Sequence, residues 1–250
     1  MDILIAGLYG LVLGSFINVV VLRLDRKEGI ITGRSECPHC GHILAWYDLV
    51  PLVSFFMLGG KCRYCQQAIS WQYPLVEVGT GCLAALFVYQ YPGGYTWQQL
   101  ISLVGMMGFW ALFLFDLKYF ILPDKIIFPL ITLSVVGMIF FNSGMLINAL
   151  LTGLLLAGSF DILYVASGGR WMGFGDVKLA LLIGLFFGYP VAVIVTVSAV
   201  WIAALFGLAL IILGKATPKT ALPFGSFMAV TAISAILFYN DLIFFRIFFP

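Results

Sequence analysis

Runs of apolar residues separated by short polar segments dominate the chain. Eight such runs, bounded by proline, glycine, asparagine or charged residues, lie at 3–22, 75–89, 97–117, 126–141, 145–165, 177–188, 191–213 and 223–239. A helix of about 20 apolar residues crosses the ~30 Å hydrocarbon core of a bilayer. The pattern therefore predicts an all-α polytopic membrane protein with about eight transmembrane helices.

The composition agrees with this architecture. Apolar residues make up 62% of the 250 and charged residues only 10%, whereas a soluble domain carries about 45–50% and about 25%. The net charge of +2, without a dense stripe of lysine and arginine, argues against a nucleic-acid partner. We expect membrane lipids to surround most of the chain.

Charged residues concentrate between the first two apolar runs. The segment 23–73 holds 10 of the 24 charged residues (13 basic plus 11 acidic), which predicts a small water-exposed module between membrane helices. The chain is therefore expected to divide into a first transmembrane helix at 1–22, a cytoplasmic module at 23–73 and a seven-helix membrane domain at 74–250.

The basic residues predict the orientation. If eight helices alternate across the membrane, the loops at 23–73, 118–125, 166–178 and 214–222 share one face. That face then carries twelve of the 13 basic residues, namely Arg23, Arg26, Lys27, Arg34, Lys61, Arg63, Lys118, Lys125, Arg170, Lys178, Lys215 and Lys219, and leaves Arg246 opposite. By the positive-inside bias, this face is cytoplasmic.

Two C-x-x-C pairs lie in the module. They are Cys37 with Cys40 and Cys62 with Cys65, separated by 21 residues. Two such knuckles supply the four thiolates of a tetrahedral zinc site. A module with few apolar residues cannot form a large hydrophobic core, and a bound metal ion would stabilise its fold. We therefore predict structural zinc in a zinc-ribbon-like module. Disulfides, which a reducing cytoplasm disfavours, and a catalytic zinc in which His39 or His42 replaces a cysteine are the alternatives.

Five carboxylates lie in or beside the apolar runs, where acidic groups mark functional sites. They are Glu77, Asp116, Asp124, Asp161 and Asp176. Asp116 ends the third run, Asp124 follows it, and Asp176 precedes the sixth run. We place these three aspartates at the cytoplasmic boundary, within reach of water.

The sixth apolar run is short. The 13 residues from Val177 to the residue before Pro190 would span roughly 20 Å as a helix, which is less than the hydrocarbon core. We therefore expect Asp176 to lie below the headgroups in a wet cavity. Gly173 and Gly175 leave room for an extended substrate strand beside this aspartate.

An aspartate from the third run and one from the sixth could face each other across a water molecule. Two close carboxylates do not both ionise readily, so one stays protonated while the other takes a proton from water. Amide hydrolysis requires this division of roles. The alternative is that these aspartates cap helices or pair with Lys118, Lys125 or Lys178.

Small residues mark one face of the first run. Gly10, Gly14 and Asn18 follow one another at four-residue steps, which predicts close helix packing with an interhelical hydrogen bond. Cys82, in the second run, is expected to be a small buried hydrophobe.

Several motifs follow in a fixed order over nearly the whole chain. They are Gly14-Ser15-Phe16 with Asn18, Arg34-Ser35 before Cys37-Pro38-x-Cys40, Pro51, Ser54, Gly60-x-Cys62 with Cys65, Ile69-Ser70, Tyr73-Pro74 with Glu77, Asp116-Leu117, Leu122-Pro123-Asp124, Gly173-Phe174-Gly175-Asp176-Val177-Lys178 and Pro223-Phe224-Gly225. In this order they resemble the type IV prepilin peptidases, which are intramembrane aspartyl proteases of the G-x-G-D kind.

The resemblance implies roles for individual residues. Asp116 and Asp176 match the two catalytic aspartates, and Asp124 is the runner-up for the first role. Glu77 matches a family position at the mouth of the second span, where a substrate contact or a basic partner is expected.

The resemblance also implies an activity. Similar enzymes cut the basic leader of type IV prepilins and pseudopilins after a glycine, at the cytoplasmic face of the bacterial inner membrane. Many members then methylate the new amino terminus with S-adenosylmethionine. No glycine-rich nucleotide motif in this sequence identifies a ligand for that cofactor.

Two other functions are compatible with buried acids. A proton- or metal-coupled transporter is disfavoured because the halves of the chain show no repeat. A non-catalytic assembly factor docking through its zinc module is disfavoured because both aspartates are intact. Asp161 matches no catalytic position, and we expect it to be buried against polar neighbours such as Ser159 or against another helix, with a helper role in proton movement as the alternative.

Overall fold

The computed structural model describes residues 3–24, 33–92, 96–217 and 220–238. Within these ranges the regular structure is helical, apart from two isolated bridges that join Glu36 to Ile43 and Lys61 to Ala68. The all-α prediction is therefore confirmed. The chain forms two compact units, Met1–Gly94 and Tyr95–Pro250. The division at 1–22, 23–73 and 74–250 stays a prediction.

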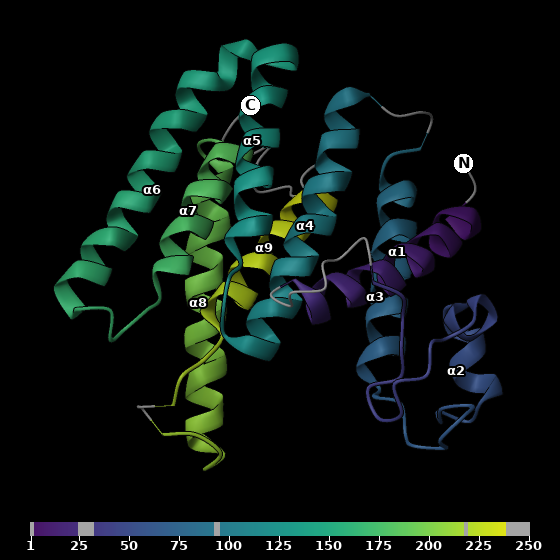
Figure 1. The fold of residues 1–250 in the computed structure, drawn as a ribbon. Coiled ribbons are helices and arrows are strands. Elements are labelled where there is room, and N and C mark those ends of the chain that lie inside the picture. The colour runs from purple at the N-terminus through teal and green to yellow at the C-terminus, as the bar shows by residue number, and fades with distance from the viewer. Residues whose placement is uncertain (1–2, 25–32, 93–95, 218–219, 239–250) are drawn as a thin grey trace. The chain divides into compact units, whose positions relative to one another are not determined.

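Each of the eight predicted runs forms a helix in the described part of the chain (Figure 1). These helices are α1 (Ile3–Arg23), α3 (Gln72–Gln90), α4 (Trp97–Tyr119), α5 (Asp124–Phe141), α6 (Leu146–Ser167), α7 (Phe174–Phe187), α8 (Val191–Ile212) and α9 (Phe224–Phe238), with η1 (Trp46–Leu49), α2 (Val53–Met57) and η2 (Ser143–Met145) between them. Among the described residues, α1, α4, α5, α6 extended by η2, and α8 are long and apolar enough to cross a membrane. Eight membrane crossings therefore stay a prediction. The placement of twelve basic residues on one face of the membrane also stays a prediction. Among the basic residues, Arg26, Lys27, Lys219 and Arg246 lie outside the described residues.

In the first unit, α1 and α3 form an antiparallel pair. A Cβ atom added at Gly10 would stand 2.8 Å from the Cα of Gly81, and one added at Gly14 would stand 2.7 Å from the backbone of α3. Only glycine permits so close an approach at these positions. Asn18 Nδ2 donates a hydrogen bond of 3.2 Å to the carbonyl oxygen of Tyr73. The predicted packing and interhelical hydrogen bond are confirmed.

In the second unit, α7 and α9 lie innermost. Helix α7 packs against α5, α6, α8 and α9, while α9 packs against α4, α7 and α8. Most residues of both helices are buried. Helix α7 has 14 residues and spans about 21 Å, which confirms the short sixth segment.

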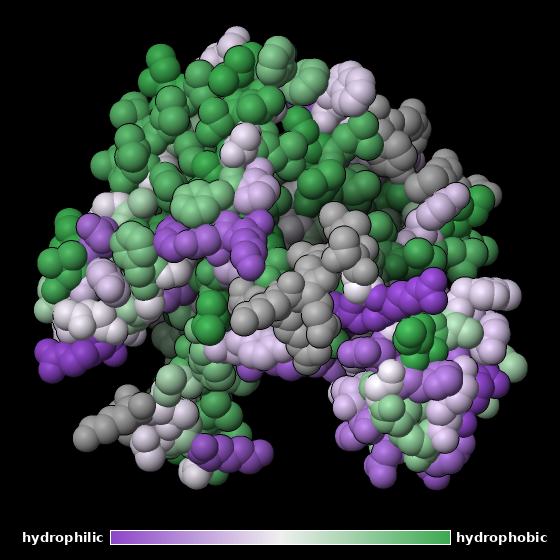
Figure 2. All heavy atoms as spheres, viewed as in Figure 1, coloured by the Kyte–Doolittle hydropathy of each residue, from purple (hydrophilic) through white to green (hydrophobic). Residues whose placement is uncertain are grey.

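The outer helices expose apolar side chains. Phe140, Ile147 and Leu155 each expose more than 70% of their surface, and Figure 2 shows hydrophobic side chains over α5 and α6. Such a surface is stable in contact with lipid and costly in contact with water.

Candidate functional site

Asp116 lies near the end of α4, where the helix stops at Phe120 in the left-handed conformation. The carboxyl group is buried, with 5% of the residue exposed. Its Oδ2 atom accepts hydrogen bonds from the backbone N–H of Ser226 at 2.5 Å and from the Ser226 hydroxyl at 2.9 Å. Ser226 lies in the first turn of α9, so the end of α4 is held against the start of α9.

Asp176 lies in the first turn of α7. Gly173 precedes this helix with an extended backbone, and its N–H donates to Asp176 Oδ2 at 3.3 Å. The residue is buried, with 8% exposed, and its carboxylate is close enough to Asp116 for the two charges to interact. The structure therefore brings together two acidic side chains that are 60 positions apart in the sequence.

Leu122 explains how the three helix ends meet. It lies in the link between α4 and α5, and a Cβ atom added at Gly175 would stand 3.1 Å from its Cβ. A Cβ atom added at Gly225 would stand 2.9 Å from Leu122 Cδ1 and 3.2 Å from Asp116 Cγ. Two glycines thus let α7 and α9 close around one leucine, next to the aspartates.

Gly173 differs from Gly175 in its surroundings. A Cβ atom added at Gly173 would meet the Asp176 carboxylate only at an ordinary contact distance of 3.9 Å, and the residue is exposed. The packing of Leu122 accounts for Gly175, whereas space for a substrate strand beside Gly173 stays a prediction.

Asp124 is not part of this pair of buried acids. It is the first residue of α5, its side chain is 52% exposed, and its Oδ1 accepts a hydrogen bond from Lys178 Nζ. This ion pair matches the alternative interpretation for Asp124, in which a nearby lysine balances its charge.

Glu77 lies in the first unit. It is buried on α3, where its Oε2 accepts a hydrogen bond of 2.9 Å from the backbone N–H of Leu52 and where Ser15 of α1 is also a hydrogen-bond partner. Leu52 precedes α2 and has a positive φ of 60°. These contacts fasten α2 to the helix pair, and a substrate contact by Glu77 stays a prediction.

The four cysteines of the module form a single cluster. The sulfur atoms of Cys37, Cys40, Cys62 and Cys65 lie within 4.8 Å of one another. Cys37 Sγ and Cys65 Sγ are 3.8 Å apart, which is far beyond a disulfide bond and equals the edge of a tetrahedron of about 3.8 Å built on Zn–S bonds of about 2.3 Å. The donor set therefore fits a tetrahedral metal ion such as zinc.

Both cysteine turns are built in the same way. The N–H of Cys37 donates to the carbonyl of His42 at 3.0 Å, and the N–H of Cys62 donates to the carbonyl of Gln67 at 2.8 Å. Gly41 and Gln66 occupy equivalent places in the two turns, with φ values of 66° and 59°. The isolated bridges flank these turns, so each knuckle is a closed local structure.

The environment of Cys37 favours a thiolate. Burial raises the pKa of this thiol, but hydrogen bonds from the backbone N–H groups of Cys40 and His39, together with those from the neighbouring cysteine thiols, lower the pKa to about 6. A thiolate is the form that binds metal. His42 instead packs on Tyr64 with tilted rings whose centroids are 3.5 Å apart, and the cluster found in the described residues contains only cysteines.

Two expectations were wrong. Asp161 is only half-buried on α6, and the Ser159 hydroxyl donates to the carbonyl of Leu156 instead. Cys82 is exposed, because it lies outside the face with which α3 packs on α1. Apolar neighbours in the sequence did not reveal which side of either helix faces outward.

Ser226 and Leu122 belong to the site, but the sequence alone did not predict a role for either residue. Leu122 stands in the Leu-Pro-Asp motif and Ser226 directly follows the Pro-Phe-Gly motif, so both were adjacent to recognised signals. Their roles depend on helix ends that meet over separations such as the 110 positions between Asp116 and Ser226. No local spacing encodes such a meeting.

The chain matches two family descriptions. Residues 8–91 match "Bacterial Peptidase A24 N-terminal domain", and residues 103–212 match "Type IV leader peptidase family". No solved structure gives a significant match.

Named relatives match the chain over about half to nearly all of its length. A protein of Pseudomonas aeruginosa named "Prepilin leader peptidase/N-methyltransferase" is 30% identical over 94% of this chain and 90% of its own length. A protein of the same name from Xanthomonas campestris is 31% identical over 95% of this chain and 91% of its own length. One from Myxococcus xanthus is 41% identical over 48% of this chain and 35% of its own length.

Proposed function

The chain belongs to the type IV leader peptidase family, and from this premise we propose that it is an intramembrane aspartyl endopeptidase. Its substrates are type IV prepilins and pseudopilins, from which it removes the basic leader after a glycine at the cytoplasmic face. One observation supports the assignment of the site: Asp116 and Asp176 lie close enough for their charges to interact, where the ends of α4, α7 and α9 converge on Leu122. The transporter alternative has no support among the named relatives, which are peptidases.

Asp116 and Asp176 divide the work of amide hydrolysis. The two hydrogen bonds from Ser226 stabilise a negative charge on Asp116, so we assign to Asp116 the removal of a proton from water. Protonated Asp176 donates a hydrogen bond to the scissile carbonyl, and a proton then passes to the departing amine. Gly173 leaves space for the substrate strand, Gly175 lets Leu122 pack beside the aspartates, and Glu77 is assigned a contact with the substrate near the module.

The cysteine cluster holds structural zinc. Cys37, Cys40, Cys62 and Cys65 supply four sulfur ligands, which leave no open position for a substrate. When bound, the ion replaces the hydrophobic core that so small a module lacks. Metal analysis of the purified protein tests this assignment, which the absence of zinc would contradict.

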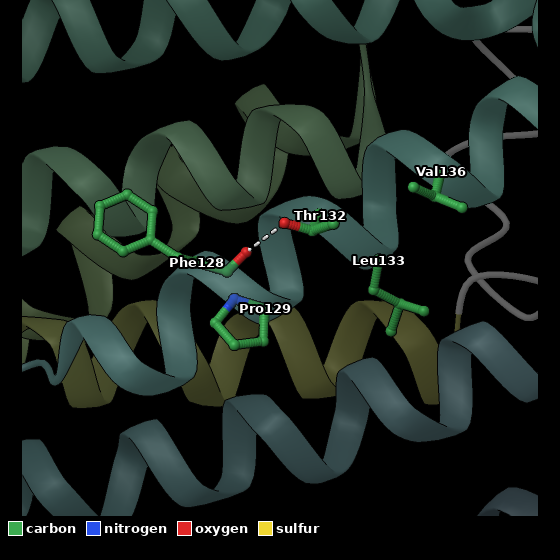
Figure 3. Close-up of a pocket in the computed structure, with 5 residues that line it drawn as sticks. All are labelled: Phe128, Pro129, Thr132, Leu133 and Val136. Atoms are coloured by element: carbon green, nitrogen blue, oxygen red, sulfur yellow. Dashed lines mark hydrogen bonds between the residues drawn. The ribbon is translucent and has the colours of Figure 1, made fainter.

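We assign to the same chain N-methylation of the new amino terminus with S-adenosylmethionine, on the printed names of its relatives. The depression on α5 lined by Phe128, Pro129, Thr132, Leu133 and Val136 does not suit this charged nucleoside, since Thr132 is its sole polar lining side chain and donates to the Phe128 carbonyl (Figure 3). No residue is therefore assigned to the binding of S-adenosylmethionine.

One experiment tests both activities. The purified protein is incubated in detergent with a prepilin and S-adenosylmethionine, and the mass of the product is measured. Loss of the leader mass supports the peptidase, and a further gain of one methyl group supports the methyltransferase. An uncut prepilin would contradict the proposed function.

The protein is placed in the bacterial cytoplasmic membrane with its module and both aspartates toward the cytoplasm. The positive-inside bias of its loops supports this orientation. Accessibility of Lys61, in the module, to a membrane-impermeant amine reagent in inside-out but not right-side-out vesicles tests it.

A further inference from the structure

The short helix α2 has one strongly apolar exposed face. Val53, Phe56 and Met57, at i, i+3 and i+4 spacing, expose 53%, 65% and 82% of their surface. Phe55 points inward and packs on Trp71, with ring centroids 5.0 Å apart. Trp71 is itself 63% exposed. These four exposed side chains, Val53, Phe56, Met57 and Trp71, form what we call the α2 face.

Hydrogen bonding fixes the height of α2 along α3. The N–H of Leu52, directly before α2, donates to Glu77 Oε2. Glu77 lies five residues after the first residue of α3, about 7.5 Å along the helix axis, and a helical side chain leans toward the N-terminus. Helix α2 therefore begins beside the first turns of α3, as Figure 1 shows.

The same part of α3 lies beside the end of α1, a helix long and apolar enough to cross a membrane, because Asn18 of α1 bonds to Tyr73 in the first turn of α3. Trp71 directly precedes α3, and α3 pairs antiparallel with the apolar α1, which ends at Arg23. The side chain of Leu75, in the first turns of α3, is 65% exposed. Apolar side chains of α3 thus already face outward at the height of α2, beside a tryptophan of the kind that favours the interface.

We propose that the α2 face is a membrane anchor that inserts into the interfacial layer of the bilayer, at the level where the apolar helix α1 ends. Its partner is the boundary between phospholipid headgroups and acyl chains, where aromatic and aliphatic side chains bind together. Exposed Lys61 of the same module suits anionic headgroups. Anchoring at this height holds the cysteine module against the membrane surface.

Photo-crosslinking of the full chain in lipid nanodiscs tests the anchor. p-Benzoylphenylalanine replaces Met57 in one variant and the exposed knuckle residue Gln67 in a matched control. We expect a phospholipid adduct at position 57 and none at position 67. The proposal is overturned if position 57 gives no lipid adduct, or if it crosslinks only to added prepilin or to a second copy of the chain.

A second variant measures the strength of anchoring. The double change Phe56→Ser with Met57→Ser removes the outward apolar groups and leaves Phe55 and the cysteines in place. We expect amide hydrogen exchange of residues 53–57 in nanodiscs to speed up on the order of tenfold, and the control pair Gln66→Ser with Gln67→Ser to leave it unchanged. Equal exchange in the double variant and the unaltered protein would contradict an anchor.

Discussion

The cysteine cluster is assembled by local structure, whereas the aspartate pair is assembled by long-range helix packing. The cysteines meet because two short turns, each closed by its own hydrogen bonds, present two sulfur atoms apiece. The aspartates meet because three helix ends converge on Leu122, with partners such as Ser226 supplied from a distant helix. Substitutions in the cysteine turns should therefore disturb only the module, whereas the aspartate pair should also respond to substitutions far away in the sequence.

The largest expected effect is on the aspartate pair. Asp116→Asn or Asp176→Asn should lower prepilin cleavage by on the order of a thousandfold or more, because each carboxyl group handles a proton in the reaction. The helices and the zinc content should remain. Leader removal, followed by mass measurement, reports the loss.

Asp124→Asn is the matched control for that prediction. Asp124 is half-exposed and paired with Lys178, so this variant should keep part of the activity. Equal loss from all three substitutions would contradict the assignment of the pair.

The next effect concerns the cysteine cluster. Cys62→Ser should release zinc and loosen the module, because three sulfur ligands and a hydroxyl bind the ion more weakly than four thiolates. Cys82→Ser, which changes an exposed cysteine outside the cluster, should keep the metal. Zinc content and limited proteolysis measure both variants, and unchanged zinc in Cys62→Ser would refute the site.

A smaller effect is expected at Ser226. Ser226→Ala removes the hydroxyl bond to Asp116 but keeps the backbone N–H bond, so kcat should fall about tenfold while KM changes little. Ser226→Thr should restore much of the rate.

Ser234→Ala on the same helix serves as the control. The Ser234 hydroxyl bonds only to the carbonyl of Val230 among the described contacts, so its loss should leave kcat unchanged. A purely structural role for Ser226 would appear as equal loss of folded protein and activity, with rescue absent in Ser226→Thr.

The smallest effect distinguishes the two knuckles. Gln66 holds a positive φ where the first knuckle has Gly41, and relief of this strain by Gln66→Gly should stabilise the module by about 1 kcal/mol. Gln67→Gly should instead destabilise it slightly, because glycine gains chain entropy without relieving strain. The chelator concentration at which half of the zinc is lost measures the stability of the module in both variants. A lower value for Gln66→Gly than for the unaltered protein would contradict the equivalence of the two turns.

Local patterns predicted the cysteine site well. The C-x-x-C spacing is itself the geometry of a knuckle, and the small-residue steps at Gly10 and Gly14 directly describe a packed helix face. The eight helical segments were likewise visible, since each apolar run is local and ends at a turn residue or a charge.

Long-range features were harder to predict. The sequence predicts a common depth for Asp116 and Asp176, but it does not predict the contact of Asp116 with Ser226, because that contact depends on how α9 packs. The hydrogen bond between Leu52 and Glu77 and the exposure of Cys82 also depend on helix packing. Hydrophobicity tells which segments leave water, whereas the rotation of each helix about its axis depends on its neighbours.

A double-substitution cycle on leader cleavage tests the central claim most directly. Single-turnover rates are compared for the unaltered protein, Asp116→Asn, Asp176→Asn and the variant carrying both changes. If the two carboxyl groups act as a unit on one water molecule, the double variant should cleave no more slowly than the slower single variant. Losses that multiply would show that the two groups act independently and would contradict the account.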